Sequence, residues 1–265
     1  MNKEKKLAEF QNATAATIKA IAANKLKNRE IQFFGNATRF TSKQITIAKS
    51  SNDFDETVVN KTRGESDEVS LKLQYHDKKI HSKLKPTSEL ASTIFNLAED
   101  TRIEKIGSKK FFGVKKNLQK LIEKKFETNL IAPPGSDDTT SFVNAMHLYL
   151  RKKLSEAPIP ENSKKTMSLW EPWLEKRVGK FISDLSKNIY DQELFGKNIN
   201  NLLTALKSEL GELDDKNNDS DDDSDEESSD EENSDDQNNT SQGDSEEENE
   251  DGIETGVEEN TESSS

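Results

Sequence analysis

The sequence predicts a mainly α-helical protein, with a multi-helix domain over residues 1–210, at most a small β element, and a long disordered acidic tail over residues 211–265. Three observations predict this. Apolar residues recur at three- and four-residue steps over most of the first 210 positions, which is typical of amphipathic helices. The short run "IQFF" from Ile31 to Phe34 is the best candidate for a strand. The last 55 residues contain almost no apolar side chains.

The charge distribution divides the chain at the same place. Residues 211–265 contain 25 acidic residues and one lysine, a formal charge of −24. The remaining 210 residues contain 26 acidic and 37 basic residues, a formal charge of +11. Ordering a backbone costs roughly 1–2 kcal/mol per residue, and the tail has only Leu213, Ile253 and Val257 to bury. We therefore expect the tail to stay disordered.

The first helix is expected over residues 4–23. Residues 36–63 are polar, and we expect loops and a small sheet that includes the segment "QITIA". A second helix is expected to begin after Gly64, with Ser66 as its N-cap, and to run as one element to Pro86.

Each later helix is predicted by its own apolar stripe. One begins at Ser88 and extends to Gly107, and Ser136 or Asp137 is expected to cap a helix that ends before Pro158. The final helix is expected to stop at Gly211. The stripes are Leu90, Ile94, Leu97; Val114, Leu118, Leu121, Ile122, Phe126; Phe142, Met146, Leu150, Leu154; Trp170, Trp173, Phe181, Leu185; and Phe195, Ile199, Leu202, Leu206, Leu210.

Several classes of protein are excluded by what the sequence lacks. There are no cysteines, which excludes disulfides, thiolate metal sites and cysteine nucleophiles. No apolar run approaches the 18 or so residues of a membrane span. The first ten residues, "MNKEKKLAEF", have charges but no apolar segment, so they do not form a secretory signal. We therefore expect the protein to be located in the cytoplasm.

The sequence contains neither a complete nucleotide-binding loop motif nor a complete von Willebrand-type metal-site motif. Gly179 and Gly196 each precede a lysine, but Phe181 and Asn198 follow where a phosphate-binding loop has Ser or Thr. The string "DDTTS", residues 137–141, follows a Pro-Pro-Gly loop instead of a buried strand. We interpret it as a helix N-cap.

The segment "HDKKIH" is the best candidate for a metal or polar cluster. His76 and His81 are five residues apart, about 140° around a continuous helix, so they diverge unless the helix is broken between them. Asp77 and His81 share a face more closely. A third ligand is available from Glu99 or Glu104. The alternative to a metal site is a structural or subunit-contact cluster, in which Arg102 neutralises carboxylates across two helices.

Two further patterns have a structural and a functional interpretation. The domain has 31 lysines but only six arginines, and its lysines are dispersed, which favours a solvated surface over a nucleic-acid-binding face. In "LWEPWL", Trp170 and Trp173 either close the core or form an aromatic pair that docks a partner. The core interpretation is favoured.

Three segments taken together resemble the N-terminal region of the CobT-type subunit of aerobic cobaltochelatase. They are "YHDKKIHSKLKP" from Tyr75, "IFNLAEDTRIEKIGSKKFFGVKKNL" from Ile94 and "LWEPWLEKRV" from Leu169. Their order, their spacing and the acidic stretch that follows are all similar to this family. The likeness covers about residues 1–250. His76, Asp77, His81, Glu99, Arg102 and Glu104 match the family's pattern positions.

The resemblance implies a subunit of a nitrogen–metal ligase in cobalamin biosynthesis. That enzyme inserts Co²⁺ into hydrogenobyrinic acid a,c-diamide with ATP and Mg²⁺. An AAA+ subunit hydrolyses ATP, a large subunit binds the macrocycle, and the CobT-type subunit couples them. The resemblance implies no catalytic residue, cofactor-binding residue or metal ligand in this chain, and no nucleic-acid or membrane partner.

The family continues beyond its acidic linker into a von Willebrand-type domain, and we expect no such domain in the sequence up to Ser265, because the acidic stretch extends to that point. A flexible 55-residue tail has a root-mean-square span of roughly 40 Å, which suits a tether between two bodies. A different hypothesis is an acidic-tailed chaperone or binding protein for basic or nucleic-acid-binding partners.

Overall fold

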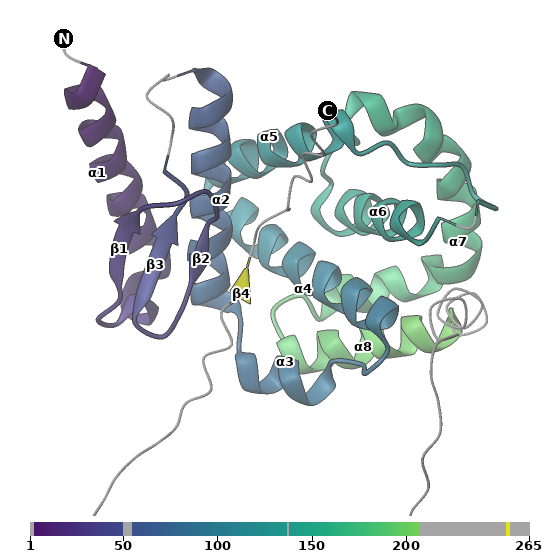
Figure 1. The fold of residues 1–265 in the computed structure, drawn as a ribbon. Coiled ribbons are helices and arrows are strands. Elements are labelled where there is room, and N and C mark those ends of the chain that lie inside the picture. Colours follow the sequence, from purple (N-terminus) through teal and green to yellow (C-terminus); the bar gives the residue numbers. More distant parts are fainter. Residues whose placement is uncertain (1–2, 50–54, 137, 207–252, 255–265) are drawn as a thin grey trace, which may run out of the picture.

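The computed structural model describes residues 3–49, 55–136, 138–206 and 253–254. Figure 1 shows two parts side by side: helix α1, a small sheet and helix α2 form one, and helices α4 to α8 form most of the other. The helices are α1 (Lys3–Ala22), α2 (Glu56–Tyr75), α3 (Lys78–Leu84), α4 (Glu89–Lys110), α5 (Phe112–Thr128), α6 (Thr139–Leu150), α7 (Lys164–Lys187) and α8 (Gln192–Ala205). The predicted mainly α fold with a small β element is confirmed.

The sheet is small and has mixed pairing. Its strands are β1 (Glu30–Phe33), β2 (Arg39–Phe40), β3 (Gln44–Ile47) and β4 (Ile253–Glu254), in the spatial order β1-β3-β2-β4. β1 runs parallel to β3, whereas β2 is antiparallel to both β3 and β4. β4 is the part of the acidic tail that the structure describes, and the rest of residues 211–265 lies outside it. Ile45 and Ile47 of β3 pack with Ile18 of α1 and Val69 of α2.

Helix α2 begins earlier than the sequence predicts. Its N-cap is Asp55, whose carboxylate accepts a hydrogen bond from the backbone N–H of Val58 at 2.7 Å, and not Ser66. Gly64 lies inside the helix, at a point where α5 passes close to it. A Cβ at this position would lie 2.8 Å from Cβ of Leu121. A glycine interpreted as a helix breaker is therefore a packing site.

The predicted continuous helix up to Pro86 is also wrong. Helix α2 ends at Tyr75, His76 is extended, and Asp77 starts the short helix α3 by accepting hydrogen bonds from the N–H groups of Lys79 and Ile80. Asp77 is a good N-cap, so the chain gains a new helix start where periodicity alone predicts continuation.

Helices α4 and α7 pack against α6, which lies at the centre of the second part (Figure 1). Nearly every residue of α6 from Ser141 to Leu150 is buried. Ser88 caps α4 as predicted, whereas α6 is capped by Asp138; of the two predicted caps, Ser136 is not the cap and Asp137 lies outside the described residues. Leu210 and Gly211, the predicted end of the last helix, lie outside them too.

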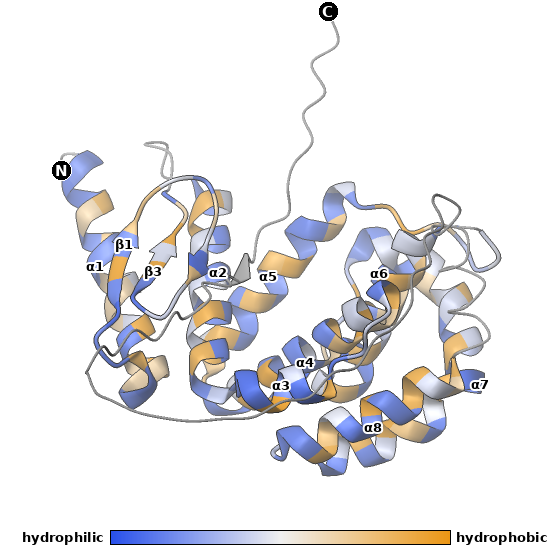
Figure 2. Ribbon diagram, turned by 60° about the horizontal axis from the view of Figure 1, so that its bottom comes forward, coloured by the Kyte–Doolittle hydropathy of each residue, from blue (hydrophilic) through white to orange (hydrophobic). Residues whose placement is uncertain are grey.

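A π-helical turn, Arg151–Ser155, follows α6 directly. Short 3₁₀ turns occupy Ala23–Leu26 and Glu161–Ser163. Apolar and polar bands alternate along the helices in Figure 2, as expected for amphipathic elements that each bury one face. Within the described residues, no helix has both the length and the apolar character needed to cross a membrane.

Candidate functional site

The break between α2 and α3 brings two histidines together. On a continuous helix their side chains would diverge, but in the structure the ring centroids of His76 and His81 lie 4.7 Å apart, edge to face. The chain turns at Asp77, so His81 folds back towards α4. The sequence allows the two rings to meet only if the helix is broken between them. The structure has this break.

Glu99 of α4 lies at the centre of the cluster and is 4% exposed. Its Oε1 lies 2.9 Å from Nδ1 of His76, and its Oε2 accepts a hydrogen bond from Nε of Arg102 at 2.7 Å. A second guanidinium nitrogen, Nη2, donates to Oε1 at 2.8 Å. Both carboxylate oxygens are therefore paired.

Arg102 is 2% exposed and ties three segments to α4. Its Nη2 donates to the carbonyl of Tyr75 at 2.7 Å and to Oε1 of Gln192 at 3.3 Å, and its Nη1 donates to the carbonyl of Ile189 at 3.3 Å. The predicted neutralisation of carboxylates across two helices is thus replaced by a pair within α4. Two backbone carbonyls and the side chain of Gln192 link Arg102 to the other segments.

Gln192, the first residue of α8, forms hydrogen bonds to the backbone at the break between α2 and α3. Its Oε1 accepts a hydrogen bond from the N–H of Asp77 at 2.7 Å, and its Nε2 donates to the carbonyl of Asp77 at 2.9 Å. The Asp77 carboxylate itself caps α3. It is therefore not a partner of the His81 side chain, although their spacing in the sequence suggests that they share a face. We refer to His76, Glu99, Arg102 and Gln192 as the Arg102 junction.

The electrostatics of the junction favour a charged Glu99 and a neutral His81. Burial by itself raises the pKa of Glu99, but the hydrogen bonds from Arg102 and His76 outweigh it and leave the pKa below its ordinary value. Burial, then the neighbouring His76, lower the pKa of His81. His81 Nε2 lies 3.0 Å from Oδ1 of Asn96, while its Nδ1 is buried without a partner in the described structure.

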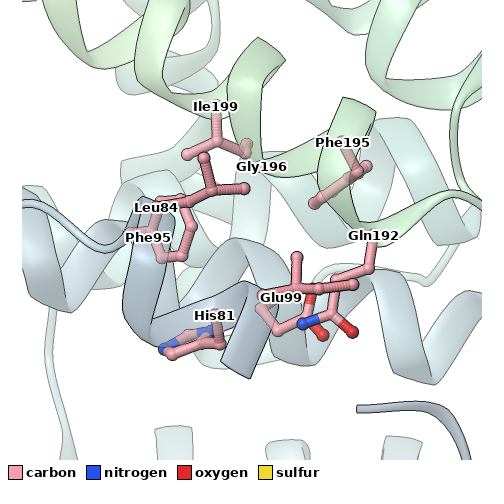
Figure 3. Close-up of a pocket in the computed structure, with 9 residues that line it drawn as sticks. His81, Leu84, Phe95, Glu99, Gln192, Phe195, Gly196 and Ile199 are labelled. Atoms are coloured by element: carbon pink, nitrogen blue, oxygen red, sulfur yellow. The ribbon is translucent and has the colours of Figure 1, made fainter. Parts of the chain in front are cut away.

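Little space remains beside these groups. The pocket in Figure 3 has a volume of about 10 Å³, the space of one water molecule. Glu99, His81 and Gln192 form its polar side, and Leu84, Phe95, Phe195, Gly196 and Ile199 form its apolar side. A substrate does not fit there. The arrangement holds α2, α3, α4 and α8 in fixed positions.

Glu104, the remaining member of the predicted cluster, belongs to a different pair. It faces Arg151 of the π-turn, with Oε2 2.7 Å from Nε and Oε1 2.6 Å from Nη2. Gln119 of α5 accepts from the same Nη2 at 3.4 Å. Arg151 is 1% exposed, and its Nη1 has no partner among the described residues. We refer to Glu104, Gln119, Arg151 and the nearby His147 as the Arg151 junction.

Trp170 lies in the core and Trp173 lies at its edge. Trp170 is 3% exposed and donates its indole N–H to the carbonyl of Ala132 at 2.7 Å. The two indole rings meet edge to face at 5.6 Å, and Phe142 contacts both at 6.0 Å. The guanidinium of Arg177 lies 3.7 Å from the ring centroid of Trp173. Docking of a partner at this pair stays a prediction.

Sequence reasoning missed the partners that complete both junctions. Gln192 lies 115 residues from Asp77, and Arg151 lies 47 residues from Glu104. Nothing local distinguishes Arg151 from the lysines that follow it. Within the described ranges, no three His, Asp or Glu side chains are grouped so that they would hold a metal ion.

Comparison with known proteins gives one family. The sequence model of the family described as "Cobalamin biosynthesis protein CobT" matches residues 4–265. No solved structure matches this chain.

Proposed function

Since the chain belongs to the CobT family of cobalamin biosynthesis proteins, we propose that it is the assembly subunit of an ATP-dependent aerobic cobaltochelatase. In this proposal it couples an AAA+ ATPase subunit to a large subunit that binds the macrocycle. The complex inserts Co²⁺ into hydrogenobyrinic acid a,c-diamide with ATP and Mg²⁺, in the cytoplasm. The observation that carries the proposal is the family match, which extends over nearly the whole chain.

The Arg102 junction supports a structural role for the side chains that match the family's pattern. The oxygens of Glu99 and the nitrogens of Arg102 have partners within the domain. Groups that are engaged in this way are not available to bind a macrocycle or to transfer a proton. Their contribution is to fix the angle between α4 and its neighbours, and therefore the shape that the domain presents to a partner.

The carboxylates of the predicted cluster, Glu99 and Glu104, also support placing the nucleotide and its Mg²⁺ on a partner. Magnesium requires near-octahedral oxygen coordination, usually with one or two carboxylates and the phosphates of the nucleotide. Glu99 and Glu104 are each committed to a buried arginine. We therefore assign Mg²⁺ and ATP to the AAA+ subunit, and Co²⁺ is a substrate of the complex.

The charge asymmetry supports a coupling role. A domain with a formal charge of +11 and a segment of −24 offer two kinds of surface to two partners. Charges act over a Debye length of about 8 Å at physiological salt. Each surface therefore acts on a partner only when the two are nearly in contact.

Reconstitution tests the proposal. The full chain is combined with the AAA+ and large subunits, and Co²⁺ insertion is followed by the absorbance change of the macrocycle. We expect insertion to require all three components and ATP, and heat-denatured chain to give none. Full activity without this chain, or ATP hydrolysis by this chain alone, would refute the proposal.

A pull-down separates the proposal from the chaperone hypothesis. Tagged full-length chain from its own cells is expected to retain the AAA+ ATPase and the large subunit in 150 mM salt. Recovery of basic proteins alone would favour the chaperone hypothesis instead.

A further inference from the structure

A groove of about 520 Å³ lies on the outer side of the Arg102 junction. It is lined by the end of α2, the last two turns of α4 and the segment before α8, through Gln74, Tyr75, Arg102, Ile106, Lys109, Lys110 and Tyr190. A volume of this size falls in the range of sites for small organic molecules. The groove is therefore large enough for a ligand, unlike the pocket beside Glu99.

The charge of the groove comes from two exposed lysines. Arg102 beneath them is neutralised by Glu99, so Lys109 and Lys110 leave the lining with a net positive charge. Neither lysine forms an ion pair in the described part of the chain. A negatively charged group is the ligand that compensates them, and a carboxylate forms strong charge-assisted hydrogen bonds with an ammonium group.

The walls of the groove are aromatic. The Nζ of Lys109 lies 5.7 Å from the ring centroid of Tyr190, and the Nζ of Lys110 lies 5.8 Å from that of Tyr75. Tyr190 is 64% exposed, a large area for an aromatic side chain that lies next to a groove. Ring faces of this kind gain by stacking against a flat apolar ligand.

Two lining residues also carry buried polar atoms without partners in the described structure. They are Oη of Tyr75 and Oε1 of Gln74. A buried polar atom without a hydrogen bond is destabilising, and a ligand that brings a matching hydroxyl or amino group supplies the missing bond. The side chain of Lys110 is flexible and its Nζ lies over the Tyr75 ring, so a ligand reaches that ring when Lys110 moves aside.

We propose that this groove binds a small aromatic carboxylate that also carries a hydroxyl or amino group. The carboxylate pairs with Lys109 and Lys110, the ring lies between Tyr75 and Tyr190, and the polar substituent pairs with Oη of Tyr75 or Oε1 of Gln74. The proposal is independent of the coupling role, because it needs only this chain. The ligand is recognised by its charge, its ring and its polar substituent together.

The test uses the fluorescence of 6-hydroxy-2-naphthoate, titrated with the full chain in 50 mM salt. We expect saturable binding that weakens at least tenfold in the double variant Lys109→Gln, Lys110→Gln. The matched control is Lys78→Gln, Lys79→Gln, which removes two exposed lysines of α3 outside the groove. We expect it to change the Kd less than twofold. The circular dichroism of both variants verifies that they are folded.

Three further compounds test each part of the recognition. 2-Naphthol, which lacks the carboxylate, is expected to bind at least tenfold more weakly, and 2-naphthoate, which lacks the hydroxyl, about threefold more weakly. Glutamate, which lacks the ring, is expected not to displace the probe at tenfold excess. Equal binding of 2-naphthol, displacement by glutamate, no saturable binding, or an equal effect of both lysine pairs would overturn the proposal.

Discussion

The Arg102 junction and the Arg151 junction use the same helix and the same kind of ion pair, but they are completed differently. In both, a glutamate of α4 holds an arginine that is at most 2% exposed. Arg102 lies on α4 itself, and each of its nitrogens has a partner. Arg151 reaches α4 from a π-turn, and its Nη1 has none among the described residues.

This difference shows what a buried arginine contributes in each place. A buried charge pair costs desolvation energy that its Coulomb attraction repays only when the remaining donors are also paired. Arg102 meets that condition by using backbone carbonyls from two distant segments. Arg151 does not, so its junction is the less complete of the two. The comparison predicts four effects of decreasing size.

The largest effect is expected from Arg102→Met. Removing the guanidinium leaves Glu99 as a buried carboxylate with only His76 as partner, and leaves the carbonyls of Tyr75 and Ile189 unpaired. Loss of one partner of a buried ion pair typically costs about 3–5 kcal/mol. We expect that loss in the free energy of unfolding of the full chain, measured by urea denaturation. Lys197→Met breaks the exposed pair with Glu193 and serves as control, with a loss far smaller than that of Arg102→Met.

A smaller loss is expected from Arg151→Met. The carboxylate of Glu104 is 13% exposed and recovers water when the arginine is gone. We therefore expect a decrease of about 2 kcal/mol in the same urea experiment, below the usual range for a buried pair. If the free energy of unfolding decreases as much as in Arg102→Met, or more, the difference in hydrogen bonding between the two arginines does not affect stability.

The next effect depends on pH and concerns His147 in the Arg151 junction. Burial, then the neighbouring Lys125 and Arg151, hold the pKa of His147 well below its ordinary value of 6.5. The unfolded chain therefore binds a proton below pH 6.5 that the folded chain refuses, and stability falls as the pH falls. One such group removes about 1.4 kcal/mol at pH 5.5.

We expect His147→Gln to lose this contribution, so that the decrease in unfolding free energy between pH 7.5 and pH 5.5 becomes smaller by about that amount. The lowered pKa of His81 adds a dependence of the same sign, and His81→Gln serves as the matched comparison. An unchanged pH dependence in the His147 variant would contradict the assignment.

The smallest effect is expected from Gln192→Ala. This change removes the hydrogen bonds to the backbone of Asp77 and one of the contacts of Arg102. The backbone groups of Asp77 are exposed and take water instead, so we expect a loss of about 1 kcal/mol. Hydrogen exchange of the Asp77 amide is expected to quicken more than exchange in α6. Unchanged exchange at Asp77 would show that Gln192 does not hold the break.

Much of the fold follows from local pattern, and the misses have physical causes. The apolar stripes of α4, α5, α6 and α8 predicted those helices, because an amphipathic face repeats with the helical period. The same logic failed at His76, because His76, Ile80 and Leu84 continue the period across the break. The N-cap signal of Asp77 was the competing information. Gly64 and Gly107 similarly admit Leu121 and Leu71, which no local pattern shows.

The candidate cluster was predictable in part. His76, His81, Glu99 and Arg102 do meet, whereas Glu104 belongs to the Arg151 junction and Asp77 takes part through its cap and backbone. The residues that complete the two junctions, Gln192 and Arg151, come from distant positions. Only the tertiary structure brings them there.

The reach of the Arg102 guanidinium also sets an order in time. Its link to the carbonyl of Ile189 spans 87 residues, and a ribosome adding about 5–20 residues per second needs roughly 4–17 s to make them. During that interval Arg102 lacks its partners Ile189 and Gln192. The junction is therefore complete only after these residues have been made. A product that ends before residue 189 keeps the bonds of Arg102 to Glu99 and Tyr75 but lacks those to Ile189 and Gln192.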